Sequence, residues 1–258
     1  SLHDALPIWT SAADAITIPT TGAGYNYAVD CDSDGTFEAT GVTGDYTCDY
    51  SGLGGAGTYT VTIAGDFPRI YFNDGGDKEK ILSVEQWGTN PWINMERAFF
   101  GATHLDINAI DTPDLSNATS MNAMFWGADV TNNTALNSWD VSTITNMAGV
   151  FAGNSNFNSD ISNWDTSSAT LMTGMFLSAS AFNGDISAWD VSNVTNMQNM
   201  FFNAAAFNQD ISGWETGNVT NMSGMFSGAV AFNQPITPAV AGGRSEEHTS
   251  ELQSRSDL

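Results

Sequence analysis

Four tryptophans recur at a fixed interval of 25 residues in the second half of the chain: Trp139, Trp164, Trp189 and Trp214. Such a period is the signature of a repeat architecture. A unit of this length carries about six large apolar side chains, each contributing ~1.5–3 kcal/mol when buried. Ordering its backbone costs about 1–2 kcal/mol per residue. One unit therefore cannot fold alone, and the sequence predicts copies that bury their apolar columns against one another.

Phenylalanine, isoleucine and methionine keep the same phase as the tryptophans. The predicted repeat core joins the four tryptophans to Phe157, Phe182, Phe207, Phe232, Ile161, Ile186, Ile211, Met147, Met172, Met197, Met222, Phe151, Phe176, Phe201 and Phe226. An exposed tryptophan column would offer a platform for sugars. Its registry with the other apolar columns favours burial instead.

Two short segments of the unit predict its local structure. The segment x-D-I-S alternates polar and apolar residues and predicts a short strand, whereas T-N-M-x-x-M-F predicts one helical or 3-10 turn. The expected fold class is therefore mixed. A β-sandwich-like module at the N-terminus precedes a leucine-rich-repeat-like solenoid, built of short parallel strands and short helical turns, over residues 91–238.

The units DISNWDTSSATLMTGMF, DISAWDVSNVTNMQNMF and DISGWETGNVTNMSGMF resemble the repeat of the BspA-like leucine-rich-repeat bacterial surface proteins, a group also found among Mycoplasma lipoproteins. Three local departures are Thr131 at a phenylalanine position, Pro113 at a tryptophan position and Glu215 in place of aspartate. The resemblance implies a secreted or cell-surface protein that adheres to an extracellular protein or glycan ligand. Two other roles remain open: an accessory region of an extracellular polysaccharide-degrading enzyme, and a passive surface spacer.

Residues 9–72 form a separate module that is rich in threonine, glycine and tyrosine. Turn residues separate strand-like runs at 15–18, 25–30, 45–50, 58–64 and 69–72, a pattern that favours a β-sandwich. The segments GYNYAVDCDSDGTFE and GTYTVTIAGDFPRIYF resemble the PKD-like modules of bacterial surface proteins. Residues 73–90 are expected to connect this module to the solenoid and to cap it.

Both ends of the sequence read as translated sequencing adapters, with SLHDALPI at the start and RSEEHTSELQS near the end. On this interpretation, residues 1–8 are an artefact, and residues 239–258 join a truncated end to a second artefact. A signal sequence or a surface anchor would then lie outside this sequence.

Charge and composition exclude several classes of partner. The chain has 29 acidic and 6 basic residues and a net charge of −23, which repels nucleic acids and anionic lipid headgroups. No apolar run is long enough to span a bilayer, so direct membrane insertion is not expected. Outside the two ends, His104 is the one histidine, and no catalytic motif is present. We therefore expect no enzyme activity.

The segment D-x-D-x-D-G offers a candidate metal site in the N-terminal module. Asp30, Asp32, Asp34 and Glu38 match ligand positions of a calcium loop, but Gly41 stands where the bidentate glutamate would be. Calcium is the one cofactor considered, and an Asp-Gly hairpin turn is the favoured alternative.

Cys31 and Cys48 are the two cysteines of the chain. Their even number permits a disulfide in an extracellular module. Two free core thiols remain nearly as well supported, because the sequence does not give the distance between them.

Aspartates also recur in columns, with Asp160, Asp185 and Asp210 as one set. Stacked residues lie about 4.8 Å apart, where like charges repel by nearly ~1 kcal/mol per pair in water. A ladder of bound cations would relieve this repulsion, but hydrogen bonding of each aspartate at a bend is the favoured explanation. The predicted ligand-binding face comprises Asp160, Ser162, Asp185, Ser187, Asp210 and Ser212.

Overall fold

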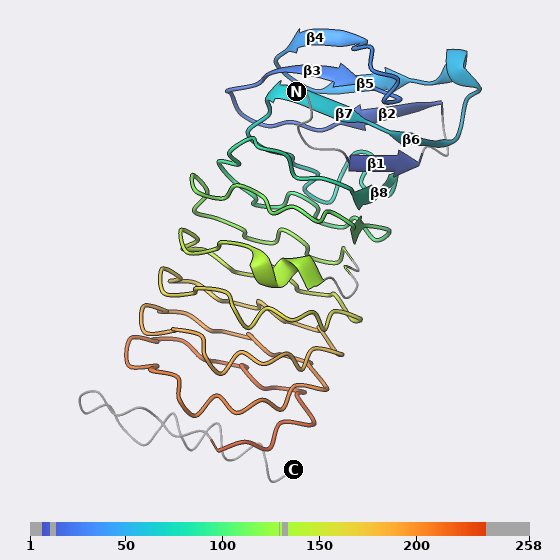
Figure 1. Ribbon diagram of the computed structural model, residues 1–258. Coiled ribbons are helices and arrows are strands. Elements are labelled where there is room, and N and C mark those ends of the chain that lie inside the picture. Colours follow the sequence, from blue (N-terminus) through green and yellow to red (C-terminus); the bar gives the residue numbers. More distant parts are fainter. Residues whose placement is uncertain (1–6, 11–13, 129, 131–133, 236–258) are drawn as a thin grey trace.

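The computed structural model describes residues 7–10, 14–128, 130 and 134–235. Figure 1 shows short strands gathered at the N-terminal end and a stack of irregular coils running from them toward the C-terminal end. The predicted artefact at residues 239–258, most of the one at residues 1–8, and Thr131 lie outside the described residues.

Three small sheets build the N-terminal part. One is antiparallel and has the order β4 (Ala39–Val42), β3 (Asn26–Asp30), β7 (Thr62–Asp66). A second pairs β2 (Ala15–Ile18) with β5 (Tyr46–Asp49) in antiparallel fashion. The third has the order β6 (Thr58–Thr60), β1 (Pro7–Thr10), β8 (Ile81–Val84), β9 (Asp106–Ile107), and only its β8–β9 pair is parallel.

Alternating side chains place one face of β2 and β3 in a core. Ile16 and Ile18 of β2 and Tyr27 and Val29 of β3 are buried, as period-two alternation requires. A disulfide joins Cys31, directly after β3, to Cys48 in β5. This bond therefore links the two sheets to each other and resolves the question that the sequence left open.

The predicted strand boundaries hold for some elements and differ for others. Residues 15–18 form β2 as expected, but the run 58–64 divides into β6 and β7, which belong to different sheets. The run 69–72 forms no strand, and the Phe72 N–H donates to the carbonyl of Ala98 in the first coils. Strand β1 begins at Pro7, inside the segment interpreted as an artefact, and β8 lies within the predicted connector.

The coils stack through backbone hydrogen bonds between residues one unit apart. Parallel bridges join Asn146 to Leu171, Leu171 to Asn196, and Asn196 to Asn221. The segment x-D-I-S, predicted as a strand, forms turns instead, because each aspartate side chain takes the N–H of the serine two residues later. The bridging position lies further along the unit, in the T-N-M segment. Apart from the 3-10 helices Ser51–Leu53 and Thr134–Ser138, turns dominate the described chain outside the strands.

Aromatic side chains fill the interior of the stack. Phe151, Phe176 and Phe201 stack with ring centroids 5.9 and 5.6 Å apart, and each ring lies 3.9 Å from a phenylalanine of a second column. The four repeated tryptophans are each only 3% exposed, and the indole N–H of Trp164, Trp189 and Trp214 donates to a carbonyl of the preceding coil. The tryptophan column is therefore core rather than an exposed platform.

Four parallel rows of backbone hydrogen bonds join each coil to the next, and we call them the donor rows. In one coil the donors are the N–H groups of Met172, Gly174, Phe176 and Ser178, and the acceptors are carbonyls 24 residues later. Equivalent groups repeat this pattern in the coils before and after. Alternate peptide groups of this segment thus point their N–H bonds toward the C-terminal end of the stack.

Candidate functional site

The predicted ligand-binding residues lie on turns at the surface of the coils. The Oδ1 atoms of Asp160, Asp185 and Asp210 accept the backbone N–H of the serine two residues later at 2.9, 3.0 and 2.9 Å. This closes an Asx turn, a local motif that competes with strand pairing. All three aspartates are exposed, and at Asp160 the second carboxylate oxygen also accepts the side-chain N–H of Asn137 at 2.7 Å.

A second set of acidic turns lies five residues further along the unit and overlaps the first set in two coils. Asp140, Asp165 and Asp190 likewise accept a serine N–H two residues later, at 3.1, 3.0 and 2.9 Å. A buried tryptophan stands just before each of these aspartates. The coil of Asp160 and Asp165 and the coil of Asp185 and Asp190 therefore each present two exposed carboxylates, separated by a buried tryptophan.

Hydrogen bonding, rather than a basic neighbour, sets the electrostatics of these turns. The Ser192 hydroxyl and then its N–H hold the pKa of Asp190 below the ordinary value, and for Asp185 the N–H of Ser187 contributes most to lowering the pKa. From Ala98 to Gly243 the sequence has no lysine or arginine. The turns thus form a regular anionic surface that complements a cationic or hydrogen-bond-donating ligand.

The candidate calcium loop brings its four predicted residues together. Ligand atoms of Asp30, Asp32, Asp34 and Glu38 all lie within 4.8 Å of one another, and Asp30 is buried. Every one of these side chains also accepts a backbone N–H of the same loop. The loop can therefore close through its own hydrogen bonds, and its carboxylate oxygens are chemically suited to a calcium ion.

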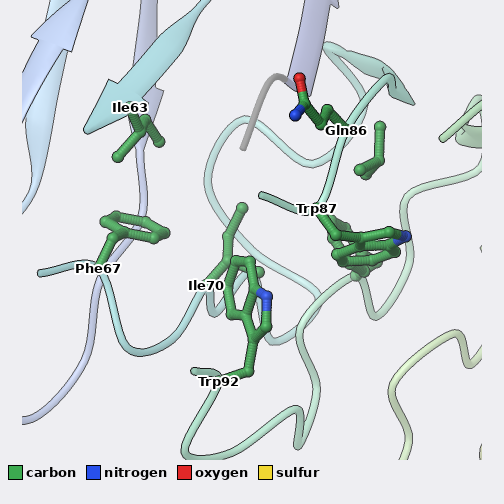
Figure 2. A pocket seen from close by; sticks show the side chains of 8 residues that line it. Ile63, Phe67, Ile70, Gln86, Trp87 and Trp92 are labelled. Carbon is green, nitrogen blue, oxygen red and sulfur yellow. The ribbon is translucent and has the colours of Figure 1, made fainter. Parts of the chain in front are cut away.

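A small apolar cavity lies where the N-terminal sheets meet the first coils (Figure 2). Its volume of about 20 Å³ suits a single water molecule rather than an organic ligand. The cavity is a packing defect of the junction and not a binding site. Its lining consists of Ile63, Phe67, Ile70, Val84, Gln86, Trp87, Trp92 and Phe99.

One surface column escaped the sequence interpretation. The hydroxyl groups of Thr145, Thr170, Thr195 and Thr220 each donate to the backbone carbonyl of the threonine one unit earlier, at 3.0–3.1 Å. These side chains are exposed and form a continuous polar line along the stack. The invariant threonine before N-M or L-M in each unit is the signal that could have revealed it.

The remaining sequence expectations concern catalysis and membranes. His104 is exposed and lies beside Glu79, with 3.4 Å between the imidazole Nδ1 and the carboxylate. Within the part of the chain that the structure covers, no helix has both the length and the apolar character needed to cross a bilayer.

Comparison with known proteins gives one match. A family model described as "Mycoplasma protein of unknown function, DUF285" matches residues 93–201 and 164–241, which together make up more than half of the chain. No curated protein matches the chain, and no solved structure does. The matched residues coincide with the stacked coils and contain both sets of acidic turns, and the chain therefore belongs to the DUF285 family.

Proposed function

We propose that this chain is a non-catalytic recognition region of a secreted or cell-surface bacterial protein that adheres to an extracellular protein or glycan. We also infer that the N-terminal sheets are a PKD-like β-sandwich module and that the coils are a leucine-rich-repeat-like solenoid. Support for the fold comes from the disulfide between two sheets and from the parallel bridges between coils.

One observation carries the functional proposal. Successive coils repeat the same exposed turn, in which a backbone N–H fixes the carboxylates of Asp160, Asp185 and Asp210 at the surface. A repeated rigid group allows several weak contacts with one extended ligand, and little conformational entropy is lost on binding. Ser162, Ser187 and Ser212 add hydroxyl groups in the same columns.

The test is a binding screen of the chain against glycan and matrix-protein arrays, followed by column variants. Replacing Asp160, Asp185 and Asp210 by asparagine keeps the side-chain oxygen that closes each turn and removes the charge. We expect binding to weaken by about tenfold or more if these contacts each supply ~0.5 kcal/mol or more. Replacing Asp140, Asp165 and Asp190 by asparagine removes the same charge from the neighbouring column and is the matched control.

The outcomes separate the alternatives. Equal binding by both triple variants would place the ligand on another face. Binding confined to polysaccharides would favour an accessory region of a polysaccharide-degrading enzyme. Absence of any ligand on either array would favour a passive surface spacer.

A further inference from the structure

A column of asparagines joins neighbouring coils at the surface of the stack. The side-chain oxygens of Asn158, Asn183 and Asn208 each accept the backbone N–H of the asparagine one unit later, at 2.8 Å in all three cases. At Asn183 the backbone N–H donates to the preceding coil, and the side-chain oxygen accepts from the following coil. The three asparagines therefore share one hydrogen-bonding arrangement, and they differ in the residue that follows each of them.

Glycine follows Asn183, and this pair is the one Asn-Gly sequence of the chain. Serine follows Asn158, and glutamine follows Asn208. Because glycine has no β-carbon, a neighbouring group can approach its backbone nitrogen closely. Among the described residues, the N–H of Gly184 donates to no acceptor. This nitrogen is therefore neither shielded by a side chain nor engaged in a hydrogen bond.

The carboxamide of Asn183 has the features of a reactive amide. Its side chain is exposed, and its NH₂ group has no acceptor in the part of the chain that the structure describes. The N–H of Asn208 on Oδ1 polarises the carbonyl and stabilises negative charge that develops on this oxygen. A nucleophile in the next residue attacks within the same molecule, which lowers the entropic cost of the reaction.

We propose that Asn183 is a site of spontaneous deamidation in the folded protein. The backbone nitrogen of Gly184 forms a bond to Cγ of Asn183 and loses its proton, and the side-chain nitrogen leaves with that proton as ammonia. The product is a succinimide ring. Water then opens the ring at either carbonyl, which gives aspartate when the main chain is restored and isoaspartate when the main chain runs through the former side chain. Water is the one co-reactant.

Both products alter the acidic turn that follows. Each adds a negative charge two residues before Asp185, on a surface that already lacks basic residues. The aspartate form keeps an oxygen that can accept the Asn208 N–H. The isoaspartate form adds one atom to the main chain, and we expect it to weaken this hydrogen bond between coils. The inference does not depend on any ligand at the acidic turns.

Ageing of the purified chain in mildly alkaline buffer tests the proposal. An endoproteinase that cleaves before aspartate, followed by mass spectrometry, places the three asparagines in separate fragments of equal length, 140–159, 165–184 and 190–209. We expect Asn183 to convert about tenfold or more faster than Asn158 and Asn208. We also expect isoaspartate beside aspartate at position 183, because direct hydrolysis of the side chain gives aspartate alone.

Two variants separate the chemistry from the fold. Gly184→Ser copies the serine that follows Asn158 and is expected to slow conversion of Asn183 by about tenfold or more. Gly213→Ser changes a glycine that follows a serine and has open space around it, and it is expected to leave conversion unchanged. Hydrogen exchange of the Asn208 amide in fresh protein checks that each variant keeps the bond between the coils.

Several results would overturn the proposal. They are an Asn183 that persists through ageing, equal conversion at all three asparagines, aspartate without isoaspartate, an unchanged rate in Gly184→Ser, and conversion that occurs in denaturant but not in the folded chain. In aged protein, exchange of the Asn208 amide should also become faster as the isoaspartate fraction rises.

Discussion

The aspartates of the repeat are held by their own turns and not by neighbours of opposite charge. In the Asx turn at Asp185, the carboxylate accepts the N–H of Ser187, and this bond lowers the pKa of the carboxyl group. The same arrangement lowers the pKa of Asp140, Asp190 and Asp210. Each of these carboxylates is thus stabilised by hydrogen bonds within its own turn, and this stabilisation does not depend on charges elsewhere on the surface.

A dependence of stability on acid pH follows from these turns. Because the pKa in the folded state lies below that of the unfolded chain, the carboxylates stabilise the fold above the unfolded pKa of about 3.9 and lose this contribution as the pH falls through the folded pKa. Melting temperature, followed by circular dichroism, is therefore expected to decline below about pH 4. The double variant Asp185→Asn and Asp190→Asn, which retains the turn oxygens, should decline less. An identical decline in variant and parent would contradict this explanation.

Calcium binding by the loop from Asp30 to Glu38 stays a prediction. Titration calorimetry of the chain with calcium is expected to give heat that Asp32→Ala loses, because that carboxylate lies among the four clustered ligand groups. Asp66→Ala, which removes an exposed acid from β7 outside the cluster, is expected to keep it. A flat trace with the parent chain would leave the loop as a turn closed by its own hydrogen bonds.

Stacked phenylalanine rings hold one coil to the next. Phe176 contacts the rings of Phe151, Phe182 and Phe201, and it is fully buried. Each coil is too short to be stable by itself, so the free energy of unfolding depends on these contacts between coils.

A truncation at this position is expected to be costly. Phe176→Ala should lower the free energy of unfolding by about 3–5 kcal/mol, because it removes a buried ring and leaves a cavity. The equivalent Phe226→Ala at the end of the described stack is the matched comparison, and it should cost less because that ring is only partly buried. Denaturant unfolding measures both, and equal losses would argue against packing between coils as the cause.

Apolar periodicity predicted the columns of the core but not the path of the backbone between them. The interval of 25 residues places Trp164 and Phe176 in the interior, where the structure also has them. It does not indicate that the aspartate before Ile186 closes a turn, since a strand and an Asx turn are both compatible with D-I-S. Nor does it reveal the donor rows, because these depend on left-handed residues such as Gly174 and Asn199, which have φ values of 59° and 56°.

The whole molecule joins two parts through shared strands and backbone contacts. Strand β8 pairs with β1 on one side and with β9, near the first coils, on the other. The sequence predicts residues 73–90 as the connector between the N-terminal module and the repeat, because the repeat pattern begins only after them. Pairing between distant segments has no signal in local composition, so the sequence could not place these residues in a sheet.

Loss of the disulfide is expected to destabilise the N-terminal sheets. It closes a loop between residues 17 positions apart, and replacing both cysteines by alanine should cost about 3 kcal/mol. Amide hydrogen exchange at Ile16 and Val29 in the sheets and at Trp189, far along the coils, can report on the two parts separately. We expect faster exchange in the sheets of the double variant, and unchanged exchange there would contradict a stabilising role.

The hydrogen bonds that join residues 72–74 to the first coil have a consequence for the order in which the chain assembles. A ribosome releases the N-terminal residues first, so Phe72 and Asp74 are available before the segment that they bond is complete. Each later coil is then synthesised next to a completed coil whose backbone N–H groups still lack their acceptors. Growth of the stack can thus follow the direction of translation, since the surface on which each new coil docks has already been made.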